Sequence, residues 1–125
     1  MTLRIDLKPY ECLRVGDARI QAGPARISFA ISGSAPVLRE RDMITREKAH
    51  FPSSRLRFLL QEAYLGRRKI DDIYDDVIEE ARQVFFADTH AKEWLEKLIH
   101  HVDAGDLFRA LKTAININTR ENCRI

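Results

Sequence analysis

The sequence predicts an α+β fold in which an N-terminal antiparallel β-meander is followed by a C-terminal bundle of three to four helices. The first forty residues alternate apolar and polar side chains with a period of two, which is typical of strands with one buried face. From residue 52 onward, apolar side chains recur at spacings of three and four, which is typical of amphipathic helices. The chain has 125 residues, 45% of them hydrophobic. We therefore expect one compact domain, with a small sheet over residues 1–40 and a helical region packed on it over residues 41–125.

The expected strands cover residues 3–7, 13–15, 18–22 and 27–31, with a short fifth strand at 37–38. Gly16-Asp17 has the composition of a two-residue hairpin turn, while Pro9 and Gly23-Pro24 end the neighbouring strands. Strict alternation places one set of apolar side chains on the inner face, namely Leu3, Ile5, Leu7, Leu13, Val15, Ile20, Ile27 and Phe29.

The region after residue 40 predicts a short turn at 45–48 and helices over about residues 52–65, 70–85, 89–102 and 107–115. Pro52 followed by two serines is a helix start signal, and Gly66 ends that helix. The segment 103–106 ends the third helix and caps the fourth, as in an αα-hairpin. The second helix has the cleanest apolar stripe, formed by Ile70, Ile73, Tyr74, Val77, Ile78, Ala81, Val84 and Phe85.

The formal net charge of +2 divides unevenly along the chain. Residues 1–68 hold thirteen Lys or Arg and seven Asp or Glu, a net charge of +6, whereas residues 69–125 carry −4. An Arg-rich half favours an anionic partner, because the guanidinium group binds phosphates and carboxylates through two parallel hydrogen bonds. No apolar run reaches the roughly 18 residues of a membrane span. The N-terminus lacks the apolar stretch of a secretory signal, and Cys12 and Cys123 do not indicate a secreted disulfide scaffold. We expect a cytoplasmic protein with no membrane partner.

Patterns that would indicate catalysis are weak. The acidic run at 71–76 resembles a DDxxD magnesium motif, but its acids occupy the positions that the apolar stripe leaves free, which favours a solvated helix face. His100 and His101 are adjacent and point about 100° apart on a helix, so they are poorly placed to share a metal ion. No nucleophile–base pair or phosphate-binding loop is recognisable. We predict no enzyme activity, no catalytic residue, no metal site and no cofactor.

The basic half indicates a nucleic-acid surface more coherently. If the apolar side chains of the strands point inward, period two sends five cations to one solvent face of the sheet, where they suit a phosphate backbone. More cations follow directly after the sheet. Ordinary solvation of a sheet face remains an alternative, since only Tyr10 is near to stack on a base. The candidate RNA-binding residues are Arg4, Lys8, Arg14, Arg19, Arg26, Arg39, Arg41 and Arg46.

Several segments in this order resemble the FlbT family of small bacterial regulators of flagellin synthesis. The first half carries Leu7-Lys8-Pro9 with Glu11, Gly16 to Ile20, Gly23 with Arg26, and Val37-Leu38-Arg39-Glu40 followed by Asp42-Met43-Ile44. The second half carries Glu47, Pro52, Arg55, Phe58, Gln61, Tyr64-Leu65, Ala104-Gly105 and Ala110-Leu111-Lys112. The resemblance spans nearly the whole chain.

The resemblance implies a post-transcriptional regulator that binds the flagellin mRNA leader and lowers its translation or stability, alongside a partner regulator called FlaF. The alternative is a protein-interaction or chaperone-like factor that binds flagellin or a FlaF-type partner and acts on the mRNA indirectly. Self-association into a homo-oligomer through exposed strand edges is also left open.

Overall fold

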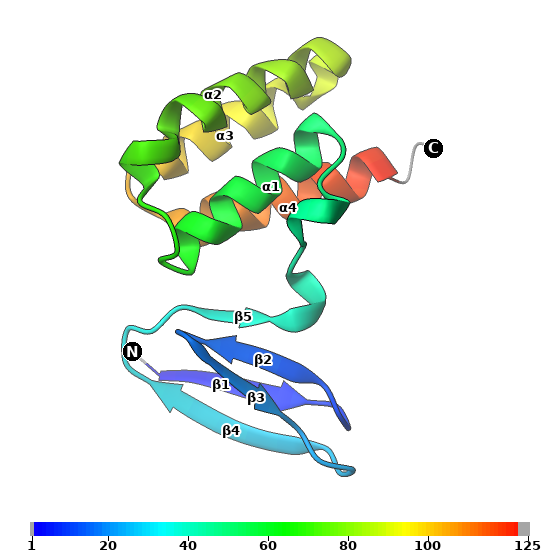
Figure 1. Ribbon diagram of the computed structural model, residues 1–125, viewed down its shortest axis with the longest axis vertical. Coiled ribbons are helices and arrows are strands. Elements are labelled where there is room, and N and C mark those ends of the chain that lie inside the picture. The colour runs from blue at the N-terminus through cyan, green and yellow to red at the C-terminus, as the bar shows by residue number, and fades with distance from the viewer. Residues whose placement is uncertain (1, 123–125) are drawn as a thin grey trace. The chain divides into compact units, whose positions relative to one another are not determined.

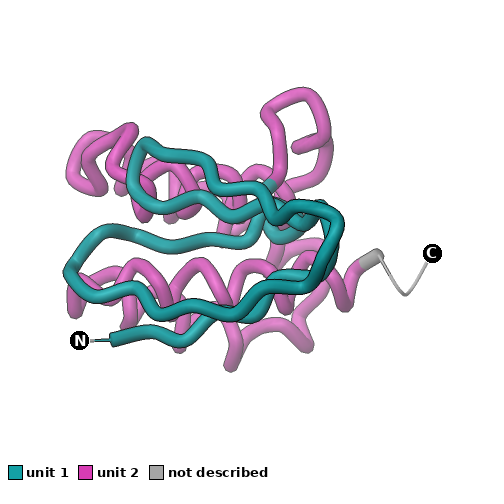
Figure 2. Tube along the Cα trace, turned by 90° about the horizontal axis from the view of Figure 1, so that it is seen from below, with its two compact units in different colours: residues 1–43 teal, residues 44–125 magenta. Residues whose placement is uncertain are grey.

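The computed structural model describes residues 2–122 and divides into two compact units, residues 1–43 and 44–125 (Figure 2). The first unit holds the strands β1 (Thr2–Leu7), β2 (Cys12–Val15), β3 (Ala18–Gln21), β4 (Ile27–Ser32) and β5 (Val37–Arg39), followed by a 3₁₀ turn at Glu40–Asp42. The second holds a 3₁₀ turn at Arg46–Lys48 and the helices α1 (Pro52–Tyr64), α2 (Ile70–Ala87), α3 (Lys92–Asp103) and α4 (Leu107–Asn122), with a 3₁₀ turn at Thr89–Ala91 before α3 (Figure 1). The predicted α+β class is confirmed.

The strands form two small antiparallel sheets. β1 pairs with β4 along its whole length, from Thr2 opposite Ser32 to Leu7 opposite Ile27. In the other sheet, β2 lies between β3 and β5. Among the described residues, β2 and β3 are the only consecutive strands that pair with each other, so the pairing is more divided than in a continuous meander. The chain crosses from the first sheet to the second in the turn at Lys8–Glu11.

The two sheets share one core within the first unit. Its fully or nearly buried members include Ile5 and Leu7 from β1 and Leu13 from β2. Leu3 and Ile27 were expected to face inward, but they are 43% and 36% exposed. These two side chains lie near opposite ends of the six-residue β1–β4 ladder. The strands of the other sheet have only three or four residues, too few to cover both ends of that ladder.

The β2–β3 hairpin follows its predicted turn. Val15 pairs with Ala18, which leaves Gly16 and Asp17 as the two loop residues. Gly16 has a φ of 59°, the left-handed conformation that tight hairpin turns require at their first central position and that glycine adopts without a steric cost.

The four helices pack on one another within the second unit. α1 contacts α2 and α4, and α3 also contacts α4. Each helix has at least one wholly buried side chain, among them Leu56, Ile73, Leu98 and Leu111. The inward half of the predicted α2 stripe is confirmed, because Ile73, Val77, Ala81 and Val84 are buried. The acids of α2 at positions 71, 72, 75, 76 and 79 are exposed.

Buried polar side chains connect distant parts of this unit. Gln61 on α1 donates from Nε2 to the carbonyl oxygen of Ile44 at 2.9 Å and accepts the Ile44 N–H at 2.8 Å. Asn118 on α4 donates to Ser53 Oγ at 3.1 Å and accepts from Arg57 Nη1 at 3.0 Å. Gln61, Asn118 and Ser53 are at most 3% exposed. These bonds hold the entering chain and α4 against α1.

Candidate nucleic-acid interface

The Lys8–Glu11 turn holds an exposed aromatic side chain in an unusual backbone conformation. The Glu11 N–H donates to the Lys8 carbonyl oxygen at 3.0 Å, which closes a four-residue turn with Pro9 second and Tyr10 third. Tyr10 has a φ of 62°, as the third position of a type II turn requires, although glycine or asparagine is usual there. Its side chain is left 62% exposed.

Three hydrogen bonds fix the Tyr10 backbone. Its N–H donates to the Gly23 carbonyl oxygen at 3.0 Å. Its own carbonyl oxygen accepts from Gln21 Nε2 at 3.4 Å and from Cys12 Sγ at 3.7 Å. A non-glycine residue at positive φ costs of order 1–3 kcal/mol and persists only where its surroundings determine it, as they do here. Residues held in such a conformation cluster at functional sites, so the Tyr10 ring is a candidate binding group.

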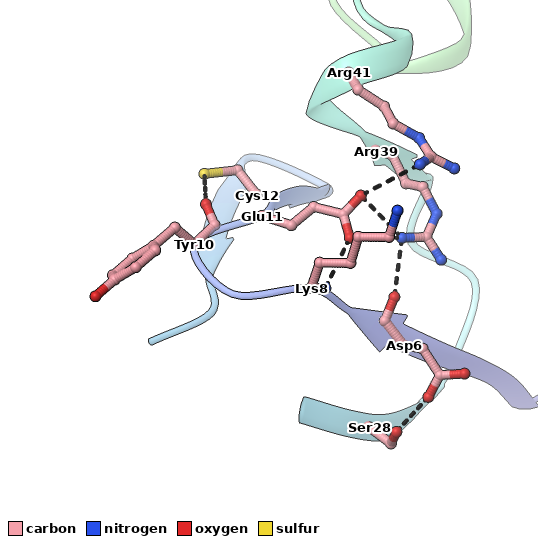
Figure 3. Close-up of polar contacts among 8 residues, drawn as sticks. All are labelled: Asp6, Lys8, Tyr10, Glu11, Cys12, Ser28, Arg39 and Arg41. Carbon is pink, nitrogen blue, oxygen red and sulfur yellow. Dashed lines mark hydrogen bonds and ion pairs between the residues drawn. The ribbon is translucent and has the colours of Figure 1, made fainter. Parts of the chain in front are cut away.

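Glu11 joins this turn to the cations that follow β5. Arg39 Nη1 lies 3.2 Å from both Glu11 carboxylate oxygens and donates to the Asp6 carbonyl oxygen at 3.0 Å (Figure 3). Arg41 Nη1 lies 3.8 Å from Glu11 Oε2. The pKa of Glu11 is lowered from its ordinary value, first by the hydrogen bond from the Lys8 N–H and then by Arg39 and Arg41. Figure 3 shows the Tyr10 ring pointing away from these guanidinium groups.

A second ion pair lies on β3 and the turn after β5. Arg19 and Glu40 are joined by two parallel bonds, Nε to Oε2 at 2.8 Å and Nη2 to Oε1 at 3.2 Å, and Arg19 Nη2 also lies 3.0 Å from Cys12 Sγ. The Arg19 hydrogen bond lowers the pKa of Glu40, and the same contact raises the pKa of Arg19. The positive charge of Arg14 contributes to the lowered pKa of Glu40.

Arg14 combines a like-charged neighbour with a buried donor that has no partner among the described residues. It lies directly opposite Arg19 in the β2–β3 ladder, so two like charges face each other across the strands. Its Nε atom is buried and has no hydrogen-bond partner among the described residues. A cation in this setting gains from an anion that neutralises it.

The structure brings together five of the eight predicted RNA-binding residues and separates the other three. We define the Tyr10 patch as Lys8, Tyr10, Glu11, Arg14, Arg19, Arg39, Glu40 and Arg41. Arg4 lies in the other sheet, on β1 opposite Ala30, and Arg26 directly precedes β4. Arg46 belongs to the second unit, where its guanidinium carbon lies 5.8 Å from the centre of the Phe58 ring. The expectation that five cations line one face of one sheet is wrong, because the strands divide into two sheets.

Two features of the patch were not predicted from the sequence. The ion pairs join residues 21 to 30 positions apart, so no local pattern reveals them. The strained conformation of Tyr10 was also missed, although Pro9 marks the turn and places Tyr10 at its third position. Cys12 is buried and forms no disulfide, and Cys123 lies outside the described residues.

The described residues 2–122 offer no group of three His, Cys, Asp or Glu side chains close enough to hold a metal ion. In the same range, no helix is both long and apolar enough to cross a membrane. The Tyr10 patch combines four arginines, one lysine and two glutamates with one exposed aromatic ring. Cations beside an exposed ring are suited to binding an anionic, ring-bearing ligand.

Comparisons with known proteins give the family. The family described as "Flagellar protein FlbT" matches residues 3–125. The "Probable flagellum biosynthesis repressor protein FlbT" of Rhodopseudomonas palustris (strain TIE-1) is 32% identical over 121 residues, which cover 97% of this chain and 95% of that protein. A Bradyrhizobium diazoefficiens protein, "Probable flagellum biosynthesis repressor protein FlbT 1", is 31% identical over 117 residues, 91% of this chain and 78% of that protein. No solved structure matches. The names of these relatives describe a regulatory role, and the chain belongs to the FlbT family.

Proposed function

We propose that this chain represses flagellum biosynthesis after transcription, by binding the leader of a flagellin mRNA through the Tyr10 patch. The relatives are named as probable repressors of flagellum biosynthesis, which supports the biological role. The observation that carries the molecular part is Tyr10, an exposed ring held at positive φ in the turn whose Glu11 pairs with Arg39 and Arg41.

Unpaired RNA suits this combination of groups. Single-stranded bases stack on aromatic and guanidinium planes, while the phosphates bind cations. Arg14 supplies a cation without a hydrogen-bonded carboxylate, whereas Arg19 and Arg39 are held in place by Glu40 and Glu11. A fixed guanidinium loses less side-chain entropy on binding than a free one. Five residues of this surface belong to the segments that carry the family resemblance, namely Lys8, Glu11, Arg19, Arg39 and Glu40.

Substitutions at Tyr10 test the role of the ring. A flagellin leader RNA is titrated against wild-type protein, Tyr10→Gly and Tyr10→Phe. Loss of one stacked base costs about 1–3 kcal/mol, so we expect Tyr10→Gly to weaken binding roughly ten- to a hundredfold and Tyr10→Phe to bind almost as wild type. Equal affinity of all three proteins would refute the role of the ring.

A pair of arginine substitutions tests the location of the phosphate contacts. Arg14→Ala removes a cation from the Tyr10 patch, and Arg4→Ala removes one of equal charge from the middle of β1 in the other sheet. Each lost phosphate contact on a single strand reduces the salt dependence of log K by about 0.7. We expect that reduction for Arg14→Ala alone, so identical salt slopes for the two variants would reject the patch as the interface.

The same preparations separate direct from indirect action. If the chain works through a protein partner instead, the tagged protein should retain that partner after RNase treatment and should bind the isolated leader no better than an unrelated RNA. Recovery of leader RNA that RNase removes supports direct binding.

A further inference from the structure

The second unit has an open apolar groove between α2 and α3, which runs beside their buried stripes and includes Ala81 and Leu95 from them. Its volume is about 590 Å³. Ile78 and Phe85 from α2 and Ile99 from α3 form its floor, and all three are partly exposed. The adjoining Phe86 is 70% exposed, and its ring centre lies 6.3 Å from that of Phe85. Large apolar side chains are thus left on a surface that no described part of this unit covers.

Charges around the groove are separated by sign along its length. α2 and α3 are antiparallel, because a single 3₁₀ turn connects them and Tyr74 near the start of α2 donates to Asp103 at the end of α3 at 2.8 Å. One end of the groove therefore carries Arg82 and Lys92. The opposite end carries Asp103, with Asp75 one turn before Ile78 on α2.

This arrangement is complementary to itself. Lys92 and Asp103 are the first and last residues of α3, about 16 Å apart along the helix axis. A two-fold axis that crosses the middle of the groove at right angles to the helices exchanges the two ends. It places the basic end of one copy on the acidic end of the other, and the reverse.

We propose that a second copy of this chain covers the groove, forming a two-fold symmetric dimer in which α2 packs antiparallel on α2 of the other copy and α3 on α3. Arg82 then faces Asp75 of the second copy, and Lys92 faces Asp103. Glu96 and His100, which lie on either side of the middle of α3 and also line the groove, face each other in the same way. The apolar floors of the two copies are buried between these pairs.

The charges select this occupant over others. A uniformly basic helix from another protein would meet Arg82 and Lys92, and a uniformly acidic one would meet Asp75 and Asp103. A dimer in the opposite orientation would place each end against its own sign, which is repulsive. An occupant pairs favourably with both ends of the groove only if it carries acidic groups at one end and basic groups at the other, in the reversed direction. The groove of a second copy of this chain has this separation of charge.

Sedimentation equilibrium of the full chain, from micromolar to millimolar concentration, tests the proposal. Wild-type protein should shift from monomer to dimer. Arg82→Asp and Asp75→Arg should each weaken the dimer at least about tenfold, because every substitution acts twice across the two-fold axis. The double variant Arg82→Asp/Asp75→Arg should recover most of the wild-type affinity. All these side chains are exposed, and circular dichroism checks that each variant folds.

Lys97→Asp is the matched control, since it reverses a charge on an exposed position of α3 that does not line the groove. It should dimerise as wild type. A wild-type protein that stays monomeric overturns the proposal and assigns the groove to another protein or leaves it bare. Single variants that dimerise normally, or a double variant no better than the singles, overturn it as well.

Discussion

Tyr10 offers a direct test of the turn on which the proposed RNA surface depends. Two substitutions, Tyr10→Gly and Tyr10→Ala, remove the same exposed ring and differ only in the methyl group of alanine. Both keep the N–H that donates to Gly23 and the carbonyl oxygen that accepts from Gln21. The difference in free energy of unfolding between them therefore isolates the cost of the left-handed conformation.

That difference has a calculable sign. An L-residue in the left-handed region costs about 1–2 kcal/mol. Glycine escapes this cost but loses about 0.5–1 kcal/mol more backbone entropy on folding than alanine does. With a φ of 62° at Tyr10, we expect Tyr10→Gly to be more stable than Tyr10→Ala by about 1 kcal/mol. At a position of ordinary φ, the order is reversed.

Urea denaturation of both variants gives the two free energies of unfolding. Lys8→Gly and Lys8→Ala provide the control in the same turn, because Lys8 has no positive φ and alanine should be the more stable there. If Tyr10→Ala is as stable as Tyr10→Gly, or more so, the turn is not strained at Tyr10 and the reasoning from strain to function fails.

Three further predictions concern buried or paired polar groups. The folded-state pKa of Glu11 is lowered, so its contribution to stability is present above its ordinary pKa and is lost as the pH falls through the folded value. We therefore expect the difference in free energy of unfolding between wild type and Glu11→Gln to be largest near neutral pH and to shrink in acid. Denaturant midpoints measured over a series of pH values check this, and a difference that stays constant with pH would contradict it. Gln61→Leu leaves the N–H and the carbonyl oxygen of Ile44 without their partner, so we expect the free energy of unfolding to fall by about 2–4 kcal/mol. Urea denaturation measures this loss, and an unchanged free energy of unfolding would contradict the prediction. Asn118→Ala breaks the bond to Ser53 and opens a small cavity, so thermal denaturation should show a loss of about 2 kcal/mol, whereas an unchanged melting temperature would show that the bond contributes nothing.

Much of the fold could be predicted because periodicity depends on local chain geometry. The α2 stripe and the Gly16 hairpin are examples. A helix with one buried face repeats apolar residues at spacings of three and four, and a two-residue turn has a characteristic composition. The pairing of β1 with β4 could not be predicted in this way, because alternation shows which side chains share a face of a strand but not which strand pairs with it. The last apolar face recognised in the sequence stops at Ile115, whereas α4 continues to Asn122. Asn118 lies buried there through bonds to residues about sixty positions away.

The candidate site was predictable in composition and not in arrangement. The patch cations Lys8, Arg14, Arg19, Arg39 and Arg41 were all named from the sequence. Their grouping depends on Glu11 and Glu40, which the family resemblance includes but which no pattern in the sequence pairs with the arginines. Tyr10 was noted as the nearby aromatic residue, but its strained backbone follows from hydrogen bonds to Gly23 and Gln21 that no local pattern encodes.

The central claim is that this chain binds a flagellin leader directly and through Tyr10. Crosslinking in living cells, followed by sequencing of the RNA attached to the tagged protein, tests it most directly. Wild-type protein should be enriched for the flagellin leader, and Tyr10→Gly, present in equal amount, should lose that enrichment. A wild-type protein without leader RNA, or a Tyr10→Gly variant that retains it in full, would contradict the account.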